Sequence, residues 1–179
     1  GLKETEITKI QTGGPDGDLG SNEILISKDK TIAVVDGSGV AYDPEGLDRK
    51  ELSRLARKRV MVQEFDKKLL SKAGFFVSVN DRDLRLPDGE KVANGEEFRN
   101  AFHLGKYAAA DIFVPCGGRP GAVNIGNWKS LLDAGGRPKF RFIVEGANLF
   151  ITEDARLRLA ENGVVLLKDA STNKGGVTS

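Results

Sequence analysis

Short apolar runs alternate with helix-like stretches along the whole chain. Runs of apolar, β-branched or aromatic residues typical of strands occupy residues 5–12, 31–35, 75–79, 112–114, 140–144 and 164–167. Helical spacing or cap chemistry indicates helices near 21–27, within 52–56 and 65–70, over 96–110, and from Thr152 to Asn162 with Gly163 beyond its end. Residues 80–95 carry Pro-Asp-Gly and Asn-Gly turns, which favour a loop or small hairpin.

Several of these strands are apolar throughout, as expected of strands covered on both faces. The pattern therefore predicts an α/β fold: a Rossmann-like, doubly wound, mostly parallel sheet with helices on both faces. In such a sheet, ligands bind beyond the carboxyl ends of the strands. Glycine-rich segments at 13–20, 115–118 and 145–148 each follow a predicted strand. We therefore expect a single ligand crevice at that edge of the sheet.

Composition and charge narrow the function classes. Hydrophobic residues are 39% and charged residues 30% of the chain, as in an ordinary globular domain. The 27 basic and 26 acidic residues are mixed along the chain, which argues against a nucleic-acid partner. No apolar run approaches the roughly 20 residues that cross a bilayer, so we expect no membrane partner. Cys116 is the single cysteine, which excludes an internal disulfide and fits a reducing compartment.

The first glycine-rich turn has the character of a dinucleotide-binding turn. Gly14, Gly17 and Gly20 are placed to supply the tight bend, the close approach of backbone to a pyrophosphate, and the helix packing on a strand. Their spacing is one residue longer than the usual fingerprint, and an ordinary glycine-rich turn is the alternative. Asp16 and Asp18 are unfavourable beside a pyrophosphate unless they point away, and one of them is able to cap the following helix.

The same two acids raise a second alternative, a calcium-binding loop. Gly20 and Ser27 stand where the EF-hand pattern requires an oxygen ligand and a glutamate, so we expect no metal site. Asp36 strengthens the dinucleotide interpretation, because it ends the strand at 31–35. A carboxylate there accepts hydrogen bonds from the adenosine ribose and repels the 2′-phosphate of NADP. The alternative role for Asp36-Gly37 is that of a simple turn.

Five segments in one order resemble the glutamate/leucine/phenylalanine/valine dehydrogenase superfamily. Residues 35–47, 144–148 and 173–178 resemble that superfamily as a whole, and residues 12–23 and 113–120 are similar to its NAD-dependent glutamate dehydrogenases of the large-subunit kind. The resemblance implies NAD as the cofactor. The residues that it implies in cofactor binding are Gly14, Pro15, Asp16, Gly17, Asp18, Leu19, Gly20, Asp36, Gly37, Cys116, Gly117, Asn148 and Asn173.

The resemblance also implies a role for several of these residues. The turn from Gly14 to Gly20 is expected to hold the pyrophosphate on backbone N–H groups at a helix start. Cys116 and Gly117 correspond to small residues whose backbone lies along the cofactor. Asn148 is implied beside the nicotinamide ribose, Asn173 at the nicotinamide amide, and Val177 at the substrate side chain.

The chain also departs from the family pattern. The turn is one residue longer and contains Pro15 and two acids, and Arg119-Pro120 replaces the polar residues of the shorter enzymes. We interpret Cys116 as a small buried residue rather than a nucleophile. His103 is expected to pack in its helix or cap it.

The resemblance implies oxidation of L-glutamate to 2-oxoglutarate and ammonia, with hydride transfer to NAD. The chain starts without methionine, stops in a glycine-rich run, and lacks the family's substrate-domain motifs. We therefore expect residues 1–179 to be the NAD-binding domain of a longer enzyme and assign no catalytic residue. The full-length enzyme is expected to be a homo-oligomer in the cytoplasm, or in mitochondria if eukaryotic. The alternatives are a non-catalytic nucleotide-sensing or regulatory domain and a dehydrogenase of another amino acid.

Overall fold

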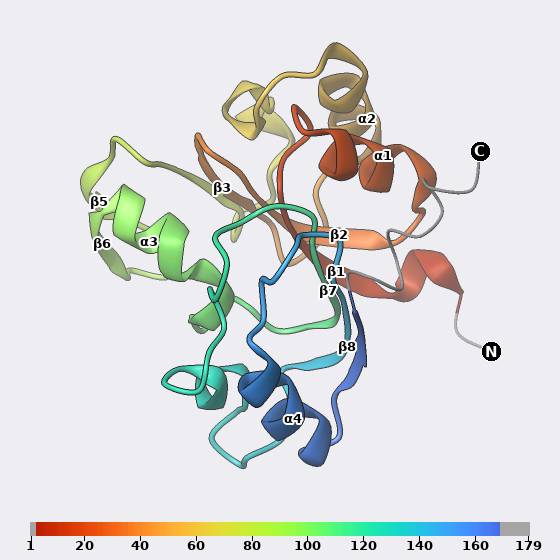
Figure 1. The fold of residues 1–179 in the computed structure, drawn as a ribbon. Coiled ribbons are helices and arrows are strands. Elements are labelled where there is room, and N and C mark those ends of the chain that lie inside the picture. The colour runs from red at the N-terminus through yellow and green to blue at the C-terminus, as the bar shows by residue number, and fades with distance from the viewer. Residues whose placement is uncertain (1–2, 169–179) are drawn as a thin grey trace.

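The fold is built on one seven-stranded sheet in the order β4-β3-β2-β1-β7-β8-β9. Figure 1 shows the computed structural model, which describes residues 3–168. The strands of the sheet are β1 Thr8–Thr12, β2 Lys30–Val35, β3 Gly39–Tyr42, β4 Phe75–Ser78, β7 Ala110–Pro115, β8 Phe140–Val144 and β9 Val165–Leu167. β3 is antiparallel to both of its neighbours, and the other neighbouring pairs are parallel. The predicted α/β, mostly parallel fold is confirmed.

Within the described part of the chain, four α-helices cover the sheet: α1 Asp18–Ile26, α2 Arg49–Lys58, α3 Gly95–Ala101 and α4 Glu153–Glu161. Short 3-10 turns occupy Glu4–Glu6, Val62–Glu64, Lys67–Leu69, Phe102–Leu104 and Trp128–Leu131. Residues 80–95 form the antiparallel hairpin β5 Arg82–Arg85 and β6 Lys91–Asn94, as the turn signals predicted. Asp48 and Asn94 accept backbone N–H groups and so cap α2 and α3.

Two hydrophobic clusters lie on opposite sides of the strands. Val34 of β2 belongs to the cluster under α1 and α2, which Figure 1 shows side by side. Its chain neighbours Ala33 and Val35 belong to the other cluster, which contains Phe102 and the α4 residue Leu159. Successive residues of β2 therefore face opposite layers, which is why the strand is apolar from Ile32 to Val35. This burial of both faces is the doubly wound arrangement.

Several element boundaries differ from the sequence predictions. The first strand begins at Thr8 rather than residue 5, and α1 begins at Asp18 rather than near Ser21. The predicted helical stretch at 65–70 is wrong, because 3-10 turns occupy 62–64 and 67–69, and Leu69 is exposed. The helix predicted over 96–110 ends as α3 at Ala101 and continues only as a 3-10 turn to Leu104 before Gly105.

Thr152 occupies the predicted N-cap position of α4, but its side chain does not make the cap bond. Its hydroxyl donates instead to the Asp154 carboxylate. Gly163, with a φ of +89°, lies just past the end of the helix as predicted. The strand β3 was not predicted, and it matters for the site because Asp36 lies in the tight turn between β2 and β3.

Candidate functional site

The candidate site lies where the direction of the sheet connections changes. From β1 the chain passes through α1 to β2 on one side, whereas β7 pairs with β1 on the other. Thr12 joins the two strand ends: its carbonyl accepts from Cys116 N at 2.7 Å and Gly117 N at 3.0 Å, and its hydroxyl donates to Gly117 O at 2.6 Å. A cavity of about 710 Å³ opens above this junction. This is the position where open α/β sheets bind ligands.

One side of the cavity, here called the glycine wall, consists of residues 13, 14, 16–20 and 35–37. Three of its glycines are required by the protein itself. A Cβ on Gly20 would lie 2.2 Å from Gly14 O, and a Cβ on Gly14 would lie 2.3 Å from a carboxylate oxygen of Asp36. Gly13 has a φ of +87°, a conformation that favours glycine. The turn can therefore lie against α1 and β2 only because these positions lack side chains.

Gly17 differs from those three glycines. Its φ is −82°, and a Cβ there would meet only Gly14 O at an ordinary 3.6 Å. It is exposed, lines the cavity, and is the N-cap residue of α1. Nothing in the described residues requires a glycine at this position. Since the first N–H groups of a helix have no partner within the helix, Gly17 leaves the positive end of α1 accessible to an anionic ligand.

Asp36 is buried on the same wall and fixes its shape. One carboxylate oxygen accepts from Ser38 N at 2.8 Å and Ser38 Oγ at 2.6 Å, and the other accepts from Val62 N at 2.6 Å. Burial raises the pKa of Asp36, and nearby Asp16 adds to the increase. Asp36 thus holds the β2–β3 turn and the segment after α2 together, which confirms its role as a turn residue. The ribose-binding role stays a prediction.

The other residues of the turn, Pro15, Asp16, Asp18 and Leu19, differ in whether they are buried, exposed or lining the cavity. Asp18 begins α1 with its side chain 92% exposed and pairs with Arg59 at 2.6 Å. The expectation that Asp16 or Asp18 caps the helix is wrong, because Gly17 is the N-cap and no side chain makes a cap bond. Asp16 and Leu19 line the cavity, whereas Pro15 is buried under the turn and is not part of the cavity surface.

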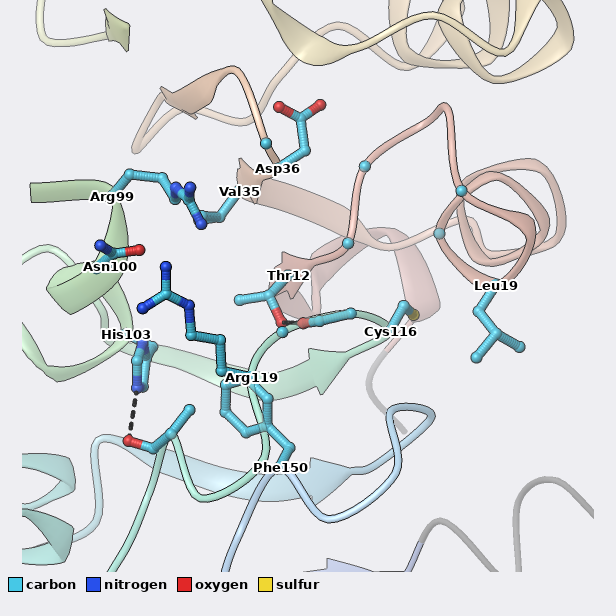
Figure 2. Close-up of a pocket in the computed structure, with 18 of the residues that line it drawn as sticks. Thr12, Leu19, Val35, Asp36, Arg99, Asn100, His103, Cys116, Arg119 and Phe150 are labelled. Carbon is cyan, nitrogen blue, oxygen red and sulfur yellow. Dashed lines mark hydrogen bonds between the residues drawn. The ribbon is translucent and has the colours of Figure 1, made fainter. Parts of the chain in front are cut away.

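The opposite side of the cavity, here called the arginine wall, consists of residues 99–101, 103, 104 and Arg119 (Figure 2). Sequence reasoning did not assign Arg99 or Asn100 to the site. Both come from the end of α3, and arginine and asparagine on a helix surface give no signal of a ligand. The position of α3 is set by aromatic packing, with the Phe98 ring 6.0 Å from Phe75 and 5.8 Å from Phe102.

Two residues with acid–base potential lie at the cavity but are poorly suited to that chemistry. His103 is buried, its Nε2 lies 3.3 Å from Ala122 O, and burial lowers its pKa, which confirms the predicted packing role. Burial raises the pKa of the Cys116 thiol to about 12, so the thiol stays protonated at neutral pH. Cys116 is therefore a small packing residue at the strand end and no activated nucleophile.

The third glycine-rich segment lies beside the cavity without lining it. Gly146 N and Ala147 N donate to Pro115 O at 3.0 and 2.7 Å, so this turn is held against the end of β7. Asn148 is exposed and is not among the lining residues. Its assignment to the nicotinamide ribose stays a prediction. Asn173 and Val177 lie outside the described residues, so their assigned roles also stay predictions.

Two further observations concern metals and membranes. Within residues 3–168, no group of three or more histidine, cysteine, aspartate or glutamate side chains is arranged to hold a metal ion. None of the described helices is long and apolar enough to span a bilayer.

Curated relatives match the chain over nearly its whole length. Glutamate dehydrogenase 2 of Dictyostelium discoideum is 59% identical over 179 residues, covering 100% of this chain and 17% of that protein. The probable NAD-specific glutamate dehydrogenase of Schizosaccharomyces pombe is 60% identical over 175 residues, covering 98% of this chain and 16% of that protein. The chain thus spans about a sixth of the length of these relatives.

Solved structures of more distant proteins share the fold. A glutamate dehydrogenase of Plasmodium falciparum superposes with a TM-score of 0.61 at 19% identity, covering 96% of this chain and 31% of that chain. The hetero-hexameric glutamate dehydrogenase of Thermus thermophilus gives 0.60 at 19% identity, covering 99% and 33%. The model of the Glutamate/Leucine/Phenylalanine/Valine dehydrogenase family matches residues 1–179. The chain therefore belongs to the Glutamate/Leucine/Phenylalanine/Valine dehydrogenase family.

Proposed function

We propose that residues 1–179 are the NAD-binding domain of a longer NAD-dependent glutamate dehydrogenase. The observation that carries the proposal is Gly17, a glycine at the start of α1 that lines the cavity and that no contact within the described residues requires. The names of the relatives at 59% and 60% identity, which include an NAD-specific glutamate dehydrogenase, support the choice of cofactor and substrate. The reaction is oxidation of L-glutamate to 2-oxoglutarate and ammonia.

The residues of the chain bind and orient the cofactor. The backbone from Gly14 to Gly20 holds the pyrophosphate at the positive end of α1. Asp36 accepts a hydrogen bond from the adenosine ribose on the carboxylate oxygen that also accepts from Val62 N, since Ser38 supplies two donors to the other oxygen. Cys116 and Gly117 place their backbone along the cofactor at the end of β7. NAD bound by these residues would supply the acceptor for the hydride that leaves the substrate.

We assign no catalytic residue to this chain. The Cys116 thiol stays protonated at neutral pH and His103 is buried against a carbonyl, so neither is suited to proton transfer. The residues that bind glutamate and move protons belong to a substrate domain elsewhere in the longer protein. Val177 is proposed at the substrate side chain, Asn148 and Asn173 at the nicotinamide end. Homo-oligomeric assembly and a cytoplasmic or mitochondrial location remain predictions of the family resemblance.

Gly17→Ala in the complete protein that carries this chain tests the proposal. The new methyl group intrudes on the ligand, so NAD should bind at least about tenfold more weakly, which is about 1.4 kcal/mol. The thermal unfolding midpoint without NAD should be unchanged, because the φ of −82° suits alanine and its Cβ has space. Calorimetric titration measures the affinity. A folded Gly17→Ala protein that binds NAD as well as the parent would show that the turn is structural only.

A further inference from the structure

Two arginines line the cavity without a carboxylate partner among the described residues. Arg99 comes from α3 and Arg119 from the segment after β7. Figure 2 shows both side chains on the side of Thr12 away from Leu19 and the start of α1. Within residues 3–168 neither guanidinium forms an ion pair, whereas Arg59 pairs with Asp18 and Arg156 with the buried Glu145. The positive charge of both arginines is therefore available to a ligand.

The Nε group of Arg99 is a further reason to expect a ligand at this arginine, which a surface arginine would not give. That atom is buried and has no hydrogen-bond partner in the described structure. A buried donor without a partner is unfavourable, and in folded proteins such groups are usually satisfied by protein, water or ligand atoms. Arg119 is exposed. The two side chains thus combine a half-buried guanidinium with an exposed one.

The acidic residues of the cavity explain why a bound pyrophosphate needs the positive charge of Arg99 and Arg119. The acids that line it, Asp16, Asp18 and Asp36, all lie on the glycine wall. Arg59 offsets Asp18 but lies outside the lining residues. A pyrophosphate carries two negative charges, and carboxylates near it are repulsive unless cations compensate. Among the described lining residues, Arg99 and Arg119 are the side chains that carry positive charge at neutral pH, because burial lowers the pKa of His103.

We propose that Arg99 and Arg119 bind the phosphate groups of the dinucleotide from the wall opposite the glycine turn. The planar guanidinium fork matches two oxygens of a phosphate, and its hydrogen bonds to an anion are charge-assisted. The glycine wall then supplies backbone donors and the arginine wall supplies the compensating charge. This inference rests on the proposed function, because it takes the phosphates to be those of NAD.

Charge-removing substitutions in the complete protein test the pair. Arg99→Gln and Arg119→Gln should each weaken NAD binding at least about tenfold and reduce its dependence on salt concentration. Arg57→Gln is the matched control, because Arg57 is exposed on α2 and lines no part of the cavity. It should change neither quantity. Adenosine, which has no phosphate, should bind the parent and the two cavity variants equally well.

Further measurements separate the possible outcomes. Arg99→Lys keeps the charge without the fork and should recover part of the affinity. If Arg99→Gln lowers the unfolding temperature, Arg119→Gln alone decides the matter, because the Arg119 side chain is exposed. NAD binding equal to the parent in the folded glutamine variants, or an equal loss for adenosine, overturns the inference and leaves the proposed function standing. A parent protein that binds no NAD overturns both.

Discussion

The two walls of the cavity are built in different ways. The glycine wall has its shape fixed by backbone contacts, as shown by the 2.2 Å that would separate a Cβ on Gly20 from Gly14 O. The arginine wall presents side chains, Arg99, Asn100 and Arg119, from the end of α3 and from the segment after β7. The shape of the cavity therefore depends mainly on the glycines of one wall, and its positive charge depends on the arginines of the other. A substitution at Gly14 or Gly20 should affect folding, whereas one at Arg99 or Arg119 should affect binding.

The largest expected effect is that of Gly20→Ala. The added methyl group would overlap Gly14 O and Gly13 O, which are backbone atoms that cannot turn aside as a flexible side chain can. We expect α1 to move off the turn and the free energy of unfolding to fall by about 3 kcal/mol. Chemical denaturation of the complete protein measures it.

Gly17→Ala serves as the control for Gly20→Ala, since it makes the same chemical change three residues away without a clash. It should leave stability at the parent value. Equal stability of all three proteins would show that backbone contact does not fix the glycine wall, and the contrast between the two walls would be lost.

The same contrast explains what could be predicted from the sequence. Constraints on a backbone appear directly as glycines, so the turn 13–20 can be recognised from the sequence alone. Arg99 was missed because its place at the cavity depends on packing of the neighbouring Phe98 against Phe75, which is distant in the chain, and against Phe102. The local sequence does not determine which face of a helix lines a cavity, because tertiary packing sets the orientation of the helix.

The sheet shows a similar division between local and distant causes. The strand at 31–35 was predicted because burial on both faces leaves it apolar after Thr31. The strand at 140–144 was predicted from its apolar residues, although Arg141 is exposed. β3 was missed because it is four residues long, begins with a glycine, and is specified by antiparallel pairing with β2 and β4. The helix over 96–110 was predicted too long, because the chain leaves the helix before Gly105. Phe98, Phe102 and Tyr107 nevertheless pack together as a cluster.

Asp36→Ser should have an intermediate effect on both shape and binding. Serine is too short to accept from Ser38 and Val62 together, so at least one buried N–H loses its partner. We expect a loss of about 1–3 kcal/mol in the free energy of unfolding. If Asp36 also binds the ribose, the preference for NAD over NADP should narrow by about tenfold or more. Denaturation and titration with both cofactors measure the two effects.

Asp43→Ser is the matched control for Asp36. Asp43 is also buried and also accepts several donors, Glu45 N, Ser71 N and Ser71 Oγ, but it does not line the cavity. It should lower stability by a similar amount and leave the ratio of NAD to NADP affinity unchanged. If that ratio also stays constant in Asp36→Ser, Asp36 is a brace for the glycine wall and takes no part in cofactor choice.

The smallest effect is expected at the exposed pair of Asp18 and Arg59, 2.6 Å apart. Exposed ion pairs contribute little to stability, and Gly17 rather than Asp18 is the N-cap of α1, so Asp18→Asn should leave the unfolding midpoint nearly unchanged. Removing one acid from the glycine wall should tighten NAD binding by about threefold at low salt and by less at physiological salt. Arg59→Gln should do the reverse, because it leaves Asp18 uncompensated.

The double variant Asp18→Asn, Arg59→Gln makes that prediction decisive. If the two charges act on the phosphates only by offsetting each other, the double variant should bind NAD like the parent at every salt concentration. If Asp18→Asn alone leaves NAD affinity unchanged even at low salt, the Asp18 charge does not reach the phosphates. The negative charge that acts on the phosphates from the glycine wall would then come from Asp16 and Asp36. Arg99 and Arg119 would compensate the charge of those two residues.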